Sequence, residues 1–216
     1  TWTWTGTISV NTEFKVNGIG TDPLGNPVNG PTYASETTSQ TIRIIGTTRT
    51  LGFWQTHTNF TTHVFYNSIT SAFFIGVSTP DCPLVTDCVG THKGVLKLPA
   101  QVFGGFYAPI AKTTTGTKRG PVDQARIQML QQLLAAKLNC AAFGCSQVTK
   151  DLITASDAAY AAVSGSKNTI ITLAGQLDAF NNSGDANAIP AELPATGKAT
   201  PSSSKAIANT AFWDTP

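Results

Sequence analysis

The sequence predicts an α+β protein with a β-rich, sandwich-like N-terminal region, a segment of three antiparallel helices, and extended arms at both ends. Three observations predict this fold. Residues 1–10 alternate strictly between apolar and polar, short β-type runs recur up to residue 112, and the apolar period becomes helical after residue 121. The expected division is an α+β domain over 1–182, β-rich over 1–112 and helical over 121–182, then an extended arm over 183–216.

The N-terminal ten residues read as a half-buried strand, with Thr and Ser on one face. The other face carries Trp2, Trp4, Ile8 and Val10. Two tryptophans on a terminal strand need a groove to receive them. That groove lies either in the same domain or in a neighbouring subunit, and the second case is β-strand addition.

The rest of the β-rich region alternates between turn formers and short apolar runs. Seven Gly and Pro residues crowd into 17–31, which we expect to be a loop. Strands are predicted at 41–48, 62–68, 73–78 and 94–103. A Thr- and Gly-rich junction at 113–121 ends the region.

Three helices follow, at 121–142, 146–163 and 168–181. Pro121 suits a first turn, Gly144 suits a stop, and Ser146 suits an N-cap. The expected buried stripes are Ile127, Leu130, Leu134, Leu138 and Ala141; Val148, Leu152, Ala155, Ala159 and Val163; and Ile170, Leu173, Ala174, Leu177 and Phe180. Short links make these helices antiparallel neighbours.

The C-terminal arm consists mainly of Gly, Asn, Ala, Pro, Ser and Thr for about 25 residues, and its last residues include Phe212 and Trp213. This aromatic pair is costly to expose to water, so it either anchors on a partner or folds back on its own domain. We assign it to the expected subunit contact, together with the N-terminal strand.

Composition indicates an exported protein. Only 12% of the residues are charged, and 33 threonines help to supply the polar surface instead. The net charge of +2 and the lack of a basic run argue against a nucleic-acid partner. The longest apolar stretch, 69–77, is too short for a membrane span. The chain begins at Thr1 without a signal-peptide pattern, which we interpret as a processed N-terminus.

Four cysteines form two close pairs and indicate disulfides in an oxidising compartment. Three connectivities are possible, and nearby turn formers favour the local bridges Cys82–Cys88 and Cys140–Cys145. The alternative is a zinc site completed by His57, His63 or His92. Five and four intervening residues fit structural zinc spacing poorly, so we expect no metal.

Two parts of the chain resemble a group of secreted bacterial and archaeal proteins of unknown function. The first is the box Gly52-Phe53-Trp54-Gln55-Thr56-His57, and the second is Gln132-Leu133-Leu134-Ala135-Ala136-Lys137-Leu138-Asn139 followed by Leu177-Asp178-Ala179-Phe180-Asn181-Asn182. This chain departs from the group at Gln55, where the group tends to have Lys, and at Thr58, where it tends to have Pro. The resemblance covers roughly 49–182 and implies export and a shared fold, with no established activity.

The box also permits a physical interpretation. If it begins a helix, Trp54 and His57 share a face, with the indole in the core and the imidazole hydrogen-bonded nearby. Metal binding by His57 and His63, with His92 as a third ligand, is the alternative to this structural role. The sequons at Asn59 and Asn181 predict glycosylation sites.

No motif for a catalytic site or a cofactor is present, so we expect no enzyme activity and no cofactor. We expect an extracellular structural subunit that self-assembles into a pilus-like filament or surface layer, by exchanging a strand or tail between copies of itself. Glycans are a further class of partner. The first alternative is a monomeric binding or adhesion module that uses Trp2, Trp4 or Trp213. A second alternative is a metal-dependent enzyme.

Overall fold

The structure is a computed structural model of the 216-residue chain, and it divides into two units, Thr1–Ile45 and Gly46–Pro216. This boundary differs from the expected one at residue 182. The structure describes residues 12–17, 19–21, 27–29, 37–42, 46–68, 73–76, 94–162 and 165–216. The predicted strand at 1–10, with Trp2, Trp4, Ile8 and Val10, lies outside the described residues.

The N-terminal unit contains two antiparallel ladders. β1 (Thr12–Asn17) pairs with β4 (Thr37–Ile42) over six residue pairs, from Thr12 opposite Ile42 to Asn17 opposite Thr37. Between them in the chain, β2 (Ile19–Thr21) pairs with β3 (Pro27–Asn29). The Gly- and Pro-rich segment expected to be a loop therefore contains a short hairpin. Pro27 is the first residue of its strand, a position that Pro tolerates.

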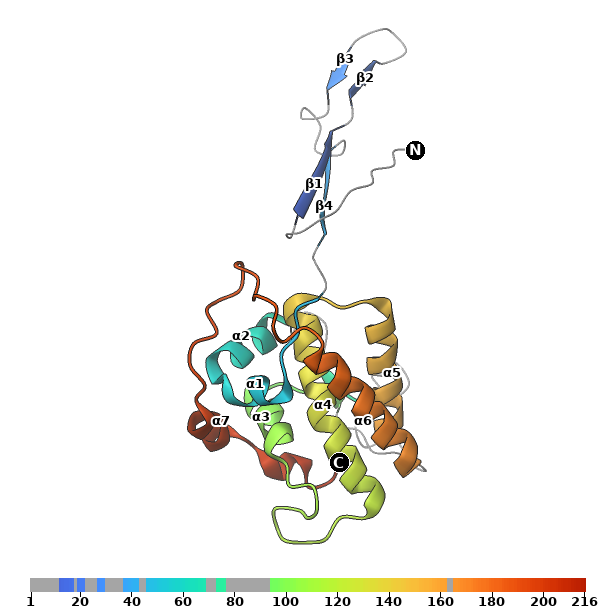
Figure 1. The fold of residues 1–216 in the computed structure, drawn as a ribbon, viewed down its shortest axis with the longest axis vertical. Coiled ribbons are helices and arrows are strands. Elements are labelled where there is room, and N and C mark those ends of the chain that lie inside the picture. The colour runs from blue at the N-terminus through green and yellow to red at the C-terminus, as the bar shows by residue number, and fades with distance from the viewer. Residues whose placement is uncertain are drawn as a thin grey trace. The chain divides into compact units, whose positions relative to one another are not determined.

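The second unit is helical, and α4 (Pro121–Phe143) is its central helix (Figure 1). It contacts α1, α2 and α3 as well as α5 and α6. The other elements are α1 (Leu51–Thr56), α2 (Thr58–Ser68), β5 (Phe74–Ile75), β6 (Gly94–Val95), α3 (Pro99–Tyr107), α5 (Gln147–Ala161), α6 (Lys167–Asn182), α7 (Pro201–Ile207) and the 3₁₀ helix η3 (Thr210–Trp213).

The predicted β-rich sandwich over 1–112 is wrong, because the described residues of this region after Gly46 are mostly helical. The segment 62–68 lies in α2, whose buried residues Phe60, Val64 and Phe65 follow helical rather than alternating spacing. The segment 94–103 contributes two strand residues and then enters α3. Pro99 occupies the first turn of that helix, where proline favours a helix start and therefore argues against a strand.

The three long helices were predicted correctly, with bounds within two residues of those expected. Ser146 caps α5 by accepting a hydrogen bond from the Thr149 N–H at 3.2 Å. Gly144, with φ of +76°, follows α4 as expected of a helix-ending glycine. Three positions of the predicted buried stripes are wrong: Val148 is 79% exposed, and Ala141 and Ala155 are also exposed.

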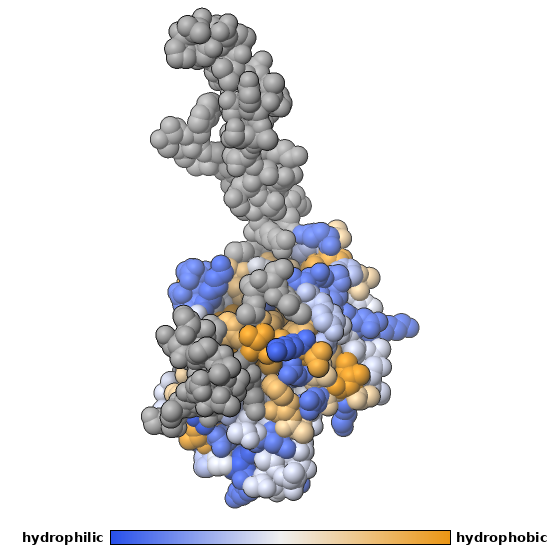
Figure 2. Space-filling model, turned by 180° about the vertical axis from the view of Figure 1, so that it is seen from behind, coloured by the Kyte–Doolittle hydropathy of each residue, from blue (hydrophilic) through white to orange (hydrophobic). Residues whose placement is uncertain are grey.

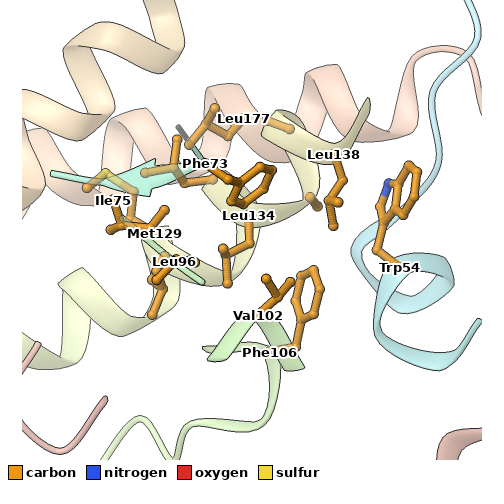
Figure 3. Packing of buried hydrophobic residues seen from close by; sticks show 14 of the residues in the cluster. Trp54, Phe73, Ile75, Leu96, Val102, Phe106, Met129, Leu134, Leu138 and Leu177 are labelled. Carbon is orange, nitrogen blue, oxygen red and sulfur yellow. The ribbon is translucent and has the colours of Figure 1, made fainter. Parts of the chain in front are cut away.

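The core of the helical unit lies around α4 (Figure 3). Leu134 and Leu138 of α4 pack near Trp54, Val102 and Phe106, which come from α1 and α3. On the other side of α4, Leu177 comes from α6, and Ile75 and Leu96 come from the short β5–β6 ladder and its end. The core therefore joins parts of the chain that the predicted division had assigned to separate β-rich and helical regions.

The C-terminal segment is not an extended arm with an aromatic anchor for a partner. Trp213 is fully buried in its own unit, and its indole N–H donates to the Gln101 carbonyl at 2.7 Å. The Asn209 N–H donates to the Ala100 carbonyl at 2.8 Å, so the segment lies along α3. A Cβ at Gly104 would overlap the Asn209 carbonyl, and this glycine therefore permits the close approach. Phe212 is half-buried against the same core.

Arg119 holds this segment in place. Its guanidinium donates to the carbonyls of Trp213 and Asp214 at 2.8 and 2.7 Å, and its Nε donates to Pro109 at 3.2 Å. The residue is only 5% exposed, so these carbonyls are satisfied away from water. The segment folds back because α3 offers an apolar surface for the indole and carbonyl acceptors for N–H groups of the segment, while Arg119 donates to the segment's carbonyls.

The surface of the helical unit mixes apolar and hydrophilic residues on the face seen in Figure 2. The large apolar side chains that are most exposed are Tyr66, Val95, Leu98, Val148, Ile171 and Ile207. None of the helices in the described part of the chain is long and apolar enough to cross a membrane.

Candidate functional site

Segments that lie far apart in the chain meet at one buried side chain, Asn139 of α4. Its Oδ1 accepts hydrogen bonds from the Trp54 indole N–H at 3.0 Å and from the Arg49 backbone N–H at 2.7 Å. Its Nδ2 donates to the Arg49 carbonyl and to Asn181 Oδ1, both at 2.9 Å. The amide thus makes four hydrogen bonds, which satisfies its full capacity, at zero exposure.

Asn181 of α6 connects Asn139 to Gln132, which lies earlier in α4. Its Nδ2 donates to the carbonyl of Gln132 at 3.0 Å and to the side-chain oxygen of Gln132 at 2.9 Å. Asn181 is fully buried, and both protons of its amide are engaged in these bonds. Its glycosylation stays a prediction.

Arg49 closes the centre on the other side. Its guanidinium donates to the carbonyls of Thr48, Asp185 and Asn187 at 2.6, 2.9 and 2.7 Å. Burial lowers the pKa of Arg49 from its ordinary value, and the charge of Asp185 opposes that shift. The guanidinium of Arg49 thereby binds the turn that follows α6 to the segment that precedes α1.

Gly184 allows these two segments to touch. Its N–H donates to Thr48 Oγ1 at 2.8 Å, and its carbonyl accepts from the Thr48 N–H at 3.3 Å. A Cβ at Gly184 would overlap the Gly46 carbonyl, so a residue without a side chain is required there. We call Arg49, Trp54, Gln132, Asn139 and Asn181 the Asn139 centre.

The box forms α1, with Trp54 inside the helix and His57 at its C-cap. Trp54 is fully buried in α1. His57 follows the helix, its ring stacks on Phe53 with centroids 4.0 Å apart, and its Nδ1 lies 3.0 Å from the Phe53 carbonyl. His63 is exposed on α2, and its Nε2 lies 2.9 Å from Asn67 Nδ2. His92 lies outside the described residues, which contain no cluster of three metal-binding side chains.

One of the two cysteine pairs falls within the described chain. Cys140 and Cys145 form a disulfide with their Cα atoms 5.0 Å apart, across the end of α4. The Gly144 N–H donates to the Cys140 carbonyl at 2.9 Å inside this loop. Cys82 and Cys88 lie outside the described residues, so their pairing stays a prediction.

The other predicted glycosylation site, Asn59, is exposed on α2. Thr61 of the same sequon is buried, and its hydroxyl donates to the Trp54 carbonyl at 2.7 Å. The sequon threonine therefore has a structural partner in the folded chain. Modification of Asn59 stays a prediction.

The buried ion pair between Lys137 and Asp157 was not predicted from the sequence. Lys137 Nζ donates to Asp157 Oδ2 and to the Phe74 carbonyl, both at 2.6 Å, and lies 4.2 Å from the Phe74 ring centroid. Asp157 Oδ1 accepts from the Gly76 N–H at 3.0 Å. The pair thus joins α4 and α5 to β5. A lysine within the apolar run of α4 was a signal for it, because a buried lysine needs a partner.

Burial is the main influence on the protonation of this pair. It lowers the pKa of Lys137 and raises the pKa of Asp157, while the attraction between the two charges opposes both shifts. The two side chains are 10% and 7% exposed. Loss of either partner would leave the other charge in an apolar setting with no ion of opposite sign bound to it.

The buried hydroxyl of Tyr160 in α5 allows a prediction about stability. Replacing Tyr160 with Phe is expected to raise the free energy of unfolding by about 1 kcal/mol, because its buried hydroxyl has no hydrogen-bond partner among the residues that the structure describes. Burial also raises the pKa of Tyr160 above its ordinary value of 10.0. Above that pH the unfolded chain loses the proton while the folded chain keeps it, so wild-type stability falls as the pH rises.

Urea denaturation at neutral pH and above pH 10.0 tests both expectations. The advantage of Tyr160→Phe over the wild type should widen at the higher pH. Tyr66→Phe is the matched control, because Tyr66 is 53% exposed and its removal should change neither value. An advantage that narrows at high pH would contradict the assignment.

The polar groups of the Asn139 centre and of the ion pair are engaged with one another and with backbone atoms of the unit. Chemically, this arrangement fixes how separate segments dock on α4. It holds the segment before α1, the turn after α6, and β5 on the central helix. No family model, no curated protein and no solved structure matches the chain.

Proposed function

We propose that the chain is an extracellular structural subunit that self-assembles into a pilus-like filament or surface layer by donating its N-terminal strand to a neighbouring copy. The observation that carries the proposal is the division of the chain into a helical unit and a separate N-terminal unit built from two-stranded ladders. A strand donor needs this kind of organisation, with a folded body and a β-element that is not part of its core.

The energetics of small β-ladders support an added strand. A two-stranded ladder is at best marginally stable in water, and a third strand with an apolar face makes such an element stable. Residues 1–10 have the composition for that strand, since apolar and hydroxyl residues alternate and none is charged. Donation between copies is head-to-tail, and such contacts generate filaments when the rotation does not close.

The helical unit supports this choice of contact. Trp213 belongs to the core of its own unit, so the proposal assigns assembly to the N-terminal strand and gives the C-terminal segment no part in it. The Cys140–Cys145 disulfide supports an extracellular setting, because disulfides persist in oxidising compartments. The low content of charged residues is consistent with the same setting.

Negative-stain electron microscopy of three purified proteins tests the proposal. These are the wild type, a version lacking residues 1–10, and a version in which the same ten residues are permuted so that apolar and polar residues no longer alternate. We expect polymers from the wild type only. The permuted version controls for length and composition. Monomers in all three samples would overturn the proposal and leave a monomeric binding module as the better hypothesis.

A further inference from the structure

Lys137 of α4 and Asp157 of α5 form a buried contact in which an amine faces a carboxyl group. Lys137 Nζ lies 2.6 Å from Asp157 Oδ2, and the two side chains are 10% and 7% exposed. An amine and a carboxyl group are the two reactants of an amide bond, and burial keeps away the water that would otherwise solvate both charges. The contact therefore has the composition of a cross-linking site as well as that of an ion pair.

The backbone atoms around the pair are placed to assist such a reaction. Asp157 Oδ1 accepts a hydrogen bond from the Gly76 N–H at 3.0 Å, and this donor polarises the carboxyl group and stabilises the oxyanion that forms when an amine attacks it. The Phe74 carbonyl accepts a hydrogen bond from Lys137 Nζ at 2.6 Å. One oxygen of the carboxyl group is thus held by the backbone, while the other oxygen faces the amine.

Burial favours the protonation states that the reaction needs. It lowers the pKa of Lys137 and raises the pKa of Asp157, although the attraction between the two charges opposes both shifts. Transfer of one proton from Nζ to Oδ2 along their 2.6 Å contact converts the ion pair into a neutral amine and a neutral carboxylic acid. The neutral amine is a nucleophile, whereas an ammonium group has no free electron pair.

We propose that Lys137 and Asp157 condense to an isopeptide bond that links α4 covalently to α5. Lys137 Nζ attacks the carboxyl carbon Cγ of Asp157, so that the Nζ–Cγ bond forms and the Cγ–Oδ2 bond breaks. Two of the three protons of the ammonium group leave with Oδ2 as water. The third proton stays on Nζ, where it donates to the Phe74 carbonyl. The step requires no oxidant, reductant or further reactant.

Positioning and burial both favour this condensation. Well-oriented groups within one molecule react with effective molarities of roughly 10⁵–10⁸ M, because the entropy of bringing them together has already been lost. Condensation also replaces two buried charges, which are costly to remove from water, with a neutral amide. The ion pair is the reactant of this step, so the free-energy costs of replacing either residue are those of the uncondensed chain.

The isopeptide bond would close a loop within the helical unit. Lys137 and Asp157 are 20 positions apart, and the Cys140–Cys145 disulfide lies inside this loop. The bond would therefore constrain the unfolded chain even after the disulfide is reduced. This inference is independent of the proposed function, since it concerns the helical unit alone and requires no second copy of the chain.

Mass spectrometry of the reduced wild-type protein tests the bond directly. We expect the intact mass to be lower than the mass calculated from the sequence by the mass of one water molecule. Trypsin should not cut after Lys137, because acylation removes the charge that the protease recognises. The digest should instead contain a branched peptide that joins residues 127–150 to residues 151–167.

Two variants assign the loss of water to this pair. Lys137→Arg keeps a cation beside Asp157 but replaces the amine with a guanidinium, so its intact mass should equal its sequence mass. Lys150→Arg is the matched control, because Lys150 is exposed on α5, and it should retain both the mass deficit and the branched peptide. Circular dichroism shows whether each variant is folded, and the peptide map of the wild type decides the proposal even if Lys137→Arg does not fold.

Two outcomes would overturn the proposal. The first is a folded wild type at its full sequence mass that trypsin cuts after Lys137, which would leave the contact as an ion pair. The second is a deficit of one water molecule that persists in Lys137→Arg or that maps to other residues, since the water would then come from a different dehydration.

Discussion

Asn139→Leu is expected to lower the free energy of unfolding by about 4 kcal/mol, because one isosteric change leaves several buried groups without partners. The Trp54 indole N–H and the Arg49 backbone N–H lose their acceptor. The Arg49 carbonyl and Asn181 Oδ1 lose their donor. Each unsatisfied group costs about 1–3 kcal/mol, and partial relaxation keeps the total below the sum. Urea denaturation followed by tryptophan fluorescence measures the change.

The control for this variant is Asn182→Ala in the same part of the fold. Asn182 is exposed at the end of α6, and its Nδ2 donates within the helix to the Asp178 carbonyl at 2.7 Å. Its replacement should change stability by no more than about 0.5 kcal/mol. A loss in Asn139→Leu as small as that of the control would show that the centre does not hold the segments on α4.

Lys137→Met is expected to cost about 3–5 kcal/mol, because it removes the cation from a buried pair and leaves the Asp157 carboxylate without its counter-ion. The Phe74 carbonyl loses its donor in the same step. The double variant Lys137→Met/Asp157→Leu should recover most of this loss, since an apolar pair of similar volume does not bury a charge. A double-mutant cycle in urea gives the coupling between the two residues.

The same variant should depend on pH in a defined direction. Without Lys137, the buried Asp157 carboxyl retains a pKa raised by burial and loses the attraction that opposed this rise. A raised folded pKa gives stability that is present at acid pH and lost as the pH rises through that pKa. The penalty of Lys137→Met should therefore be smallest below pH 3.8, the ordinary pKa of the carboxyl, and should grow as the pH rises above it. A penalty independent of pH would contradict the buried-pair assignment.

The long helices could be predicted from the sequence because their signals are local. Pro121, Gly144 and Ser146 mark helix ends through the chemistry of a single turn, and the apolar stripe of α4 repeats with helical spacing from Ile127 to Leu138. α2 and α3 are 11 and 9 residues long and rich in β-branched and aromatic residues. Their composition suits a strand as well as a helix, and tertiary packing decides between the two.

The candidate site could be predicted only in part. The sequence placed Trp54 in the core and drew attention to the stretches that contain Asn139 and Asn181. It could not pair them, because Asn139 bonds to residues 90 and 42 positions away in the chain. The burial of Trp213 could not be predicted for the same reason, because its indole N–H bonds to a carbonyl 112 positions away in the chain. Trp213 lies against Gly105 and donates to the Gln101 carbonyl, and both residues belong to α3, part of a segment that its composition predicts to be a strand.

The way in which the chain enters the helical unit has a mechanical consequence. The Thr47 hydroxyl donates to the Ala188 carbonyl at 3.1 Å, the Thr48 N–H donates to the Gly184 carbonyl, and the Arg49 backbone is held at both its polar atoms by Asn139. A tensile load applied to the chain before residue 46 would meet these bonds before it reached α1. They would transmit part of that load to the turn after α6 and to the central helix α4.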